Sequence, residues 1–183
     1  MGKKLSKIGW LIIVGCIVLA GGVVCAKSPG TFKPDSEPDG FRGIKWGQDI
    51  STVDDLVFVS TDPAFGGIDL YVRKGDEMKM GGAELDRILY GFWKDKLSSV
   101  IIYTKGYVNW DSFKAVVFEK FGKGYQGNKY IEEYVWGGEK AMMMLDYNEF
   151  SKEGMLLMWS KEISIQQEEW KEQQAKKGAE EGW

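Results

Sequence analysis

Histidine is absent from this chain of 183 residues, and only two cysteines occur, Cys16 and Cys25, both in one apolar stretch near the N-terminus. Without histidine there can be no Ser-His-Asp triad, no Cys-His pair and no imidazole metal ligand. No GxxxxGK[ST] pattern occurs, and no GxGxxG pattern follows a predicted strand, so nucleotide binding has no support. We therefore expect no cofactor, no metal site and no catalytic activity.

Positive charge is also in short supply. The first 26 residues hold three lysines and no acids, which leaves 21 basic and 27 acidic side chains, a net charge of −6, in residues 27–183. An acidic domain is a poor partner for phosphate backbones, so we expect no binding of nucleic acid. Apolar residues make up 44% of the chain, which argues against disorder and for a packed core.

The one long apolar run, residues 8–26, follows Lys3, Lys4 and Lys7. A basic start followed by an apolar run is typical of an export signal. Three outcomes are open for it: cleavage after Ala26, retention as a membrane anchor, or lipid attachment at Cys16. The 19 residues of the apolar run are just enough to span a hydrocarbon core of ~30 Å, which keeps the membrane anchor open. The residues after Cys16 are apolar, which argues against lipidation.

Composition divides the chain into four segments. Residues 1–26 form the export signal. Residues 27–40 carry three of the four prolines and only Phe32 as a large apolar residue, which predicts a disordered tether. Residues 41–163 predict a single α+β domain, and the charged, glutamine-rich residues 164–183 predict a solvated helix or tail.

A hairpin over residues 84–104 is the clearest strand pattern. Aromatic and β-branched residues fill both arms, and a polar turn at Lys94-Asp95-Lys96 joins them. Apolar residues on both faces predict that the hairpin is central in its sheet, with a helix over at least one face. Gly91 inside the first arm predicts a bulge or a closely packed neighbour.

Two helices are predicted within the domain. The first is short, covers residues 49–56 and is capped by Asp49 or Ser51. The second runs from an N-cap at Asn109 to a stop at Gly122. Its apolar spacing predicts a buried face made of Trp110, Phe113, Val117 and Phe121.

Further strands complete the predicted fold. Residues 68–73 alternate as a strand with one solvated face, a second hairpin turns at Gly137-Gly138-Glu139, and a strand follows from residue 154. Together the patterns predict an α+β fold: a mostly antiparallel sheet of about six strands, two short packing helices and a charged C-terminal helix. A loose α-β-β-β duplication, over residues 46–104 and 110–161, is one interpretation of this order.

Two groups of aromatic side chains are candidate binding residues, because exposed aromatics mark interfaces and ligand clefts. The first group shares a strand face and would contact a protein partner, unless a helix covers that face as core. The second group would line an aromatic cleft between sheet and helix for an apolar or glycan ligand. The first group is Tyr130, Tyr134 and Trp136, and the second is Trp46, Trp93 and Trp110.

A carboxylate-dependent glycan enzyme is the third hypothesis. Two other patterns are rejected as metal sites, because Asp54 and Asp55 point about 100° apart on a helix and Met142 to Met144 alternate between the faces of a strand. The carboxylates available to an enzyme on predicted strands are Asp86, Glu132, Glu133 and Asp146.

Several motifs resemble those of a family of small, uncharacterised exported bacterial proteins with a GIxWG lead-in and two antiparallel strand sets. The matching stretches are FRGIKWG, YVRKGDE, LYGFWKDKLSSVII, the NWDSF…FG helix and YVWGG, within residues 41–163. The resemblance implies a fold and a location in the periplasm or at the periplasmic face of the inner membrane, but no activity. We therefore expect a non-catalytic envelope protein that contacts another protein through its sheet; the alternative is a small-ligand binding protein.

Overall fold

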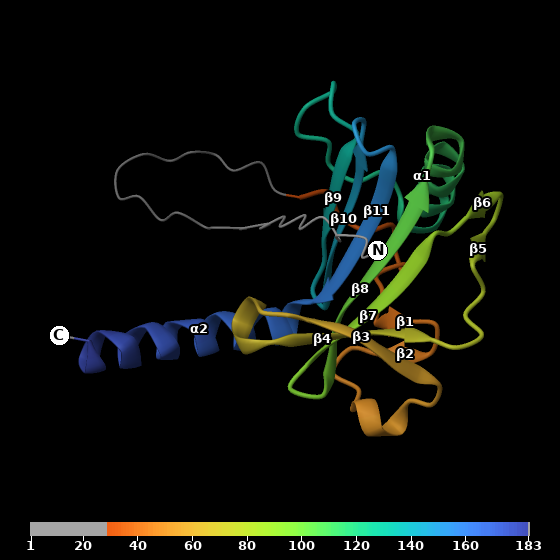
Figure 1. Ribbon diagram of the computed structural model, residues 1–183. Coiled ribbons are helices and arrows are strands. Elements are labelled where there is room, and N and C mark those ends of the chain that lie inside the picture. The colour runs from red at the N-terminus through yellow and green to blue at the C-terminus, as the bar shows by residue number, and fades with distance from the viewer. Residues whose placement is uncertain (1–28, 183) are drawn as a thin grey trace, which may run out of the picture.

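A seven-stranded antiparallel sheet forms the centre of the protein in the computed structural model, which describes residues 29–182 (Figure 1). The strand order across the sheet is β3-β4-β7-β8-β11-β10-β9. The predicted α+β class with an antiparallel sheet is confirmed, with seven strands instead of about six. The strands are β3 (Leu56–Asp62), β4 (Ile68–Arg73), β7 (Arg87–Trp93), β8 (Lys96–Lys105), β9 (Glu133–Gly137), β10 (Ala141–Asn148) and β11 (Glu153–Ser160).

Short elements and two α-helices surround this sheet. The helix predicted over residues 49–56 is reduced to a single 3-10 turn: Asp49 does cap it by accepting a hydrogen bond from the Ser51 N–H, but Asp55 has a φ of +66° and Leu56 already begins β3. The remaining elements are η1 (Ile50–Thr52), η2 (Ala64–Gly66), α1 (Tyr107–Phe121), α2 (Lys161–Glu181), and the small hairpins β1 (Gly40–Phe41) with β2 (Ile44–Lys45) and β5 (Lys79–Met80) with β6 (Ala83–Glu84).

The predicted central hairpin is β7 and β8, the third and fourth strands of the sheet. Its turn consists of Lys94 and Asp95 alone, both with positive φ, as a two-residue type I′ connection requires. The register shifts between Gly91 and Phe92, so the predicted bulge is confirmed. Ser98 is the extra residue, and its hydroxyl donates to the Gly91 carbonyl oxygen.

Helix α1 lies on one side of the sheet against β8, β11 and β6 (Figure 1). The four buried side chains of α1 are those predicted from the spacing, Trp110, Phe113, Val117 and Phe121, and Gly122 ends the helix at a φ of +80°. The predicted start was wrong: α1 begins at Tyr107 after Gly106, and the Asn109 amide donates to the Lys105 carbonyl within the first turn. Packing of this helix on the sheet forms the main core.

Residues 29–40 form an ordered strap, so the predicted disordered tether is wrong for this part; Lys27 and Ser28 lie outside the described residues. Gly30 exchanges backbone hydrogen bonds with Val135 and Gly137 of β9, and the Lys33 N–H donates to the Phe121 carbonyl at the end of α1. The Phe32 ring packs edge-on against Phe121. These long-range bonds offset the low apolar content that predicted disorder.

Glu37 fastens the end of the strap to the second hairpin. Its carboxylate accepts hydrogen bonds from the backbone N–H groups of Lys140 and Ala141, at 2.5 and 2.8 Å. Burial alone would raise the pKa of Glu37, but the Ala141 and Lys140 N–H groups outweigh it and hold the pKa below its usual value. The strap therefore belongs to the folded domain.

Helix α2 leaves the end of β11 and projects from the body of the protein (Figure 1). The Ser160 hydroxyl caps it by accepting from the Ile163 N–H, and the helix begins at Lys161, three residues before the predicted boundary at residue 164. Only Ile163 and Gln167 of this helix are buried, which confirms the charged C-terminal helix. Across residues 29–182 no helix is long and apolar enough to span a membrane, and the predicted export segment with Cys16 lies outside the described residues.

The two outer strands of the sheet are protected in different ways. Tyr125 and Gly30 bond to the outer side of β9 and so cover that edge. β3 leaves Val57, Phe58 and Val59 exposed, but its register shifts between Phe58 and Ser60. A bulge in an outer strand hinders pairing with another chain, so we do not regard the β3 edge as the principal docking surface.

The pairing of β8 with β11 lies at the centre of the sheet. These are the last strands of residues 46–104 and 110–161, the two segments that a duplication would relate. The first segment contributes four strands to the large sheet and begins with the 3-10 turn η1, whereas the second contributes three and begins with α1. The likeness of the two segments is therefore limited to the way their last strands meet.

Candidate functional site

The predicted aromatic docking face is not on the surface. Tyr134 and Trp136 are 5% and 0% exposed, because α1 lies over this side of β9 and the Phe118 ring packs against both. Tyr130 is 83% exposed but lies in the loop before β9. The prediction that Tyr130, Tyr134 and Trp136 form one exposed patch is therefore wrong, and the alternative, a face covered by a helix, holds for the last two.

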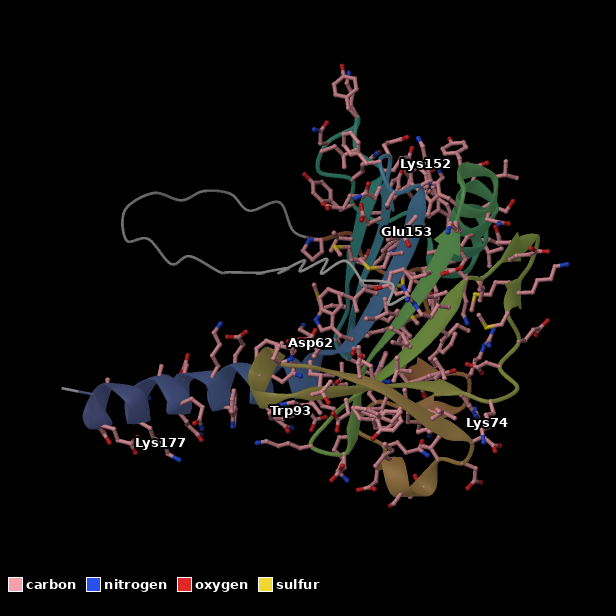
Figure 2. The ribbon with its side chains drawn as sticks, in the orientation of Figure 1. Asp62, Lys74, Trp93, Lys152, Glu153 and Lys177 are labelled. Carbon is pink, nitrogen blue, oxygen red and sulfur yellow. The ribbon has the colours of Figure 1, made fainter. Side chains whose placement is uncertain are left out.

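The three tryptophans predicted to line a cleft do not meet. Trp93 is buried at the turn end of β7 and donates from Nε1 to the Phe65 carbonyl. Trp110 is buried near the other end of β8, beside Gly154. Figure 2 shows Trp93 and Glu153 at opposite ends of the domain. Trp46 donates to the Pro38 carbonyl within the N-terminal strap, so the predicted aromatic cleft of Trp46, Trp93 and Trp110 is wrong.

The predicted carboxylates are also dispersed. Asp86 is exposed in the link before β7, and Glu132 accepts hydrogen bonds from Lys114 Nζ at 2.9 Å and the Tyr134 hydroxyl at 3.1 Å. Burial alone would lower the pKa of Lys114, but the hydrogen bond to Glu132 outweighs this effect and raises the pKa above its usual value. Glu132 is thus held in a structural ion pair. Only Glu133 and Asp146 are brought together, as cross-strand neighbours.

The side of the sheet opposite α1 carries a continuous, mostly apolar surface, which we call the open face. Strand pairing aligns its side chains in three rows across β7, β8, β11 and β10, so that each row has four members. The first row is Arg87, Tyr103, Met155 and Asp146; the second is Leu89, Ile101, Leu157 and Met144; the third is Gly91, Ser99, Trp159 and Met142.

The open face is accessible on β8, β10 and β11 and at Arg87, whereas Leu89 and Gly91 of β7 are buried. On β10 and β11 its side chains are all partly exposed, whereas the alternate residues that face α1 are buried. Of the described helices, α2 alone approaches it, and only at the third row. There, Met142 and Trp159 form the floor of a groove of about 340 Å³ whose wall is α2, with Ile165 and Glu169 among the lining residues.

Charged groups lie at the two ends of the first row. Asp146 is paired directly across from Glu133 on β9, and like charges at such a position destabilise a sheet. Burial raises the pKa of Asp146, and the charge of Glu133 raises it further. At the other end, the Arg87 guanidinium lies over the Tyr103 ring, 4.3 Å from its centre. Within residues 29–182, neither Arg87 nor Asp146 has an ion-pair partner.

Replacing Asp146 with asparagine should increase the stability of the monomer at neutral pH. A carboxyl whose pKa is raised by folding is a penalty when ionised, and the penalty fades as the pH falls through that raised pKa. The melting temperature of dilute D146N should therefore exceed that of the wild type at pH 7, and the difference should shrink toward pH 4. An equal difference at both pH values would contradict the electrostatic cause.

Sequence patterns identified the strands of the open face but not its exposure. In β11, Met155, Leu157 and Trp159 alternate with Leu156 and Met158, so both faces of this strand are apolar. The only available indication was this two-sided pattern in a chain with few predicted helices, since one helix of 15 residues cannot cover both sides of a wide sheet.

No family model, no curated protein and no solved structure matches this chain. Within residues 29–182, no three histidine, cysteine, aspartate or glutamate side chains gather in a way that could hold a metal ion. The open face is therefore the candidate functional site of the described residues.

Proposed function

We propose that this protein is a non-catalytic interaction module of the cell envelope and that it docks a protein surface on the open face. The single observation that supports this function is a partly exposed apolar surface across the central strands, opposite the helix-covered side. Contiguous apolar surface of this kind on a soluble domain marks an interaction site. Three methionines, Met142, Met144 and Met155, give it side chains that adapt to the shape of a partner.

The chemistry of the open face defines the partner. The centre, with Ile101 and Leu157, requires an apolar surface without buried charge. The first row requires a cationic group opposite Asp146 and Glu133, and an anionic group opposite Arg87, because a charge buried at an interface without its counterpart is costly. The partner is thus a polypeptide surface that is apolar at its centre and carries one charge of each sign at its margin.

Export remains part of the proposal and is supported by the basic start and apolar run of residues 1–26. The strap adds a geometrical point, because Pro29 lies beside Gly137, whose other near neighbour is the sulfur of Met142. The export segment is therefore joined to the domain at the margin of the open face, with only Lys27 and Ser28 between. A retained anchor would hold the open face close to the membrane surface.

Methionine oxidation tests this function directly. In intact envelopes treated with dilute hydrogen peroxide, Met142, Met144 and Met155 should oxidise several-fold more slowly than in purified protein diluted until it is monomeric, because a docked partner excludes the oxidant. Tandem mass spectrometry reads each methionine separately, because fragment ions distinguish methionines that share one tryptic peptide, such as Met142 and Met144. Met78 is 41% exposed outside the open face and serves as the internal control.

The control decides how the result is read. If all four methionines oxidise equally fast in envelopes and in dilute protein, the open face is unoccupied in the cell and the proposed function is wrong. If Met78 is slowed together with the others, the envelope merely limits peroxide, and the rates are compared after normalisation to Met78.

A further inference from the structure

The open face itself has the properties that its partner must have: it is apolar at its centre and carries one charge of each sign at its margin. Its four central strands are arranged symmetrically about the β8–β11 pair, with β7 and β10 on either side. From this arrangement we infer that the partner is a second copy of this chain, which packs its open face on that of the first around a two-fold axis parallel to β8 and β11. This inference rests on the proposed function, because it names the occupant of the same surface.

The two-fold axis dictates which residues meet. Rotation about a line between β8 and β11 places β7 of one copy opposite β10 of the other, and keeps each row opposite the same row. Two sheets packed face to face align their strands within about 30°, so the rows stay in register near the axis. In the second row, Ile101 then faces Leu157 beside the axis, and Met144 faces the edge of Leu89, which is only 7% exposed.

The first row supplies the charges that a partner must carry. The axis brings Arg87 of each copy opposite Asp146 of the other, with Glu133 beside it. Neither Arg87 nor Asp146 has an ion-pair partner within residues 29–182 of one copy. In the dimer, each would pair with the other residue of the second copy, so that two such ion pairs form. Between them, Tyr103 faces Met155, a contact of the sulfur–aromatic type. The charge pattern is therefore self-complementary.

The third row contributes little to the contact. Gly91 is buried, and the space above it is filled by the side chains of Ser99, Ile68 and Leu70. Met142 and Trp159 lie in the groove beside α2, so this helix flanks the row. The contact between the two copies is therefore centred on the first two rows.

The area of the open face fits a weak, reversible dimer. Four strands spaced ~4.8 Å apart and three rows spaced ~6.8 Å apart give a face of roughly 390 Å² in plan. Two such faces remove about 800 Å² from solvent, which is below the range of stable specific interfaces and within that of transient ones. The mostly apolar composition is that of a homodimer interface.

Exchange of the two charges tests the inference. The full chain is expressed with its N-terminal segment, purified from the envelope in mild detergent, and its mass is followed against concentration by sedimentation. The wild type should be a dimer that dissociates on dilution. R87D and D146R should each raise the dissociation constant by at least about tenfold, because each places like charges opposite one another twice per dimer. The double variant R87D/D146R should recover most of this loss.

Both positions tolerate the change, since Arg87 is exposed and Asp146 partly exposed, and unfolding curves verify that each variant is folded. K177E on the exposed part of α2, labelled in Figure 2, is the matched charge change away from the open face and should leave the dimer intact. A dimer that is indifferent to R87D and D146R, or a double variant as weak as the single ones, would overturn the inference.

The two hypotheses fail separately. A monomer at every concentration, together with methionines that are protected in the envelope, overturns the second copy and leaves the proposed function standing with a different protein as occupant. A monomer with unprotected methionines overturns both.

Discussion

Replacing Trp136 with alanine should lower the free energy of unfolding by about 4 kcal/mol, within the ~3–5 kcal/mol typical of a buried tryptophan. Trp136 is 0% exposed, and its ring lies directly over Gly124, where a Cβ atom would be 2.7 Å from the indole. Its Nε1 donates to the Gly122 carbonyl oxygen at 3.0 Å. The substitution removes the packing of α1 against β9 and leaves that oxygen without its donor.

Thermal unfolding followed by circular dichroism measures this effect, and the melting temperature should fall by roughly 10 °C for a domain of this size. Tyr130 provides the matched control: Y130A truncates an aromatic side chain six residues away that is 83% exposed, and it should change stability by less than about 0.5 kcal/mol. W136A with an unchanged melting temperature would mean that the side chain is not core, and the predicted aromatic docking face would have to be reconsidered.

The sequence could predict what depends on neighbours along the chain. The turn at Lys94 and Asp95, the bulge at Gly91 and the buried face of α1 all follow from local spacing and backbone preference, and all three are present. The prediction of a short helix after Asp49 was wrong for a local reason that residue spacing does not reveal. Asp55 adopts a left-handed conformation, and the chain turns into β3.

Features that depend on distant contacts could not be predicted. The strap around Gly30 and Glu37 has a composition typical of a tether, and it is ordered only because β9 and the turn after it supply hydrogen-bond partners about 100 residues away. The exposure of Tyr134 and Trp136 likewise depends on the side of the sheet on which α1 packs. Period-two alternation divides a strand into two faces, but it does not say which one a helix covers.

This choice of side links the core to the function. Because α1 covers the side that carries Tyr134 and Trp136, the rows containing Met144 and Leu157 are left on the other side. Helix α2 could have covered them, but its only large apolar residues are Ile163, Ile165 and Trp170, and Trp170 is engaged with Gly66 of η2. The open face is therefore a consequence of having one apolar helix for a sheet that is apolar on both sides.

The tight packing beneath α1 leads to the second large effect, at Gly154 near the start of β11. A Cβ atom at this position would lie 2.5 Å from Thr104 Oγ1 and 2.5 Å from Cε3 of Trp110. Neither neighbour can move freely, because both are 0% exposed and the Trp110 ring is stacked on Tyr147 with ring centres 5.4 Å apart. The site therefore has no room for a side chain.

Gly154→Val should consequently lower the free energy of unfolding by about 3 kcal/mol, since overpacking a closed core forces neighbouring side chains and backbone to shift. The higher strand propensity of valine acts in the opposite direction, but it contributes at most ~1 kcal/mol, so the steric cost prevails. Chemical denaturation should show a lower midpoint with an unchanged slope. Gly178→Ala is the control, because a Cβ atom on this exposed turn of α2 meets nothing within 4 Å and alanine favours the helix by ~1 kcal/mol. If G154V unfolds at the wild-type midpoint, α1 does not press on β11 as described, and the side of the sheet that is left open would have to be assigned again.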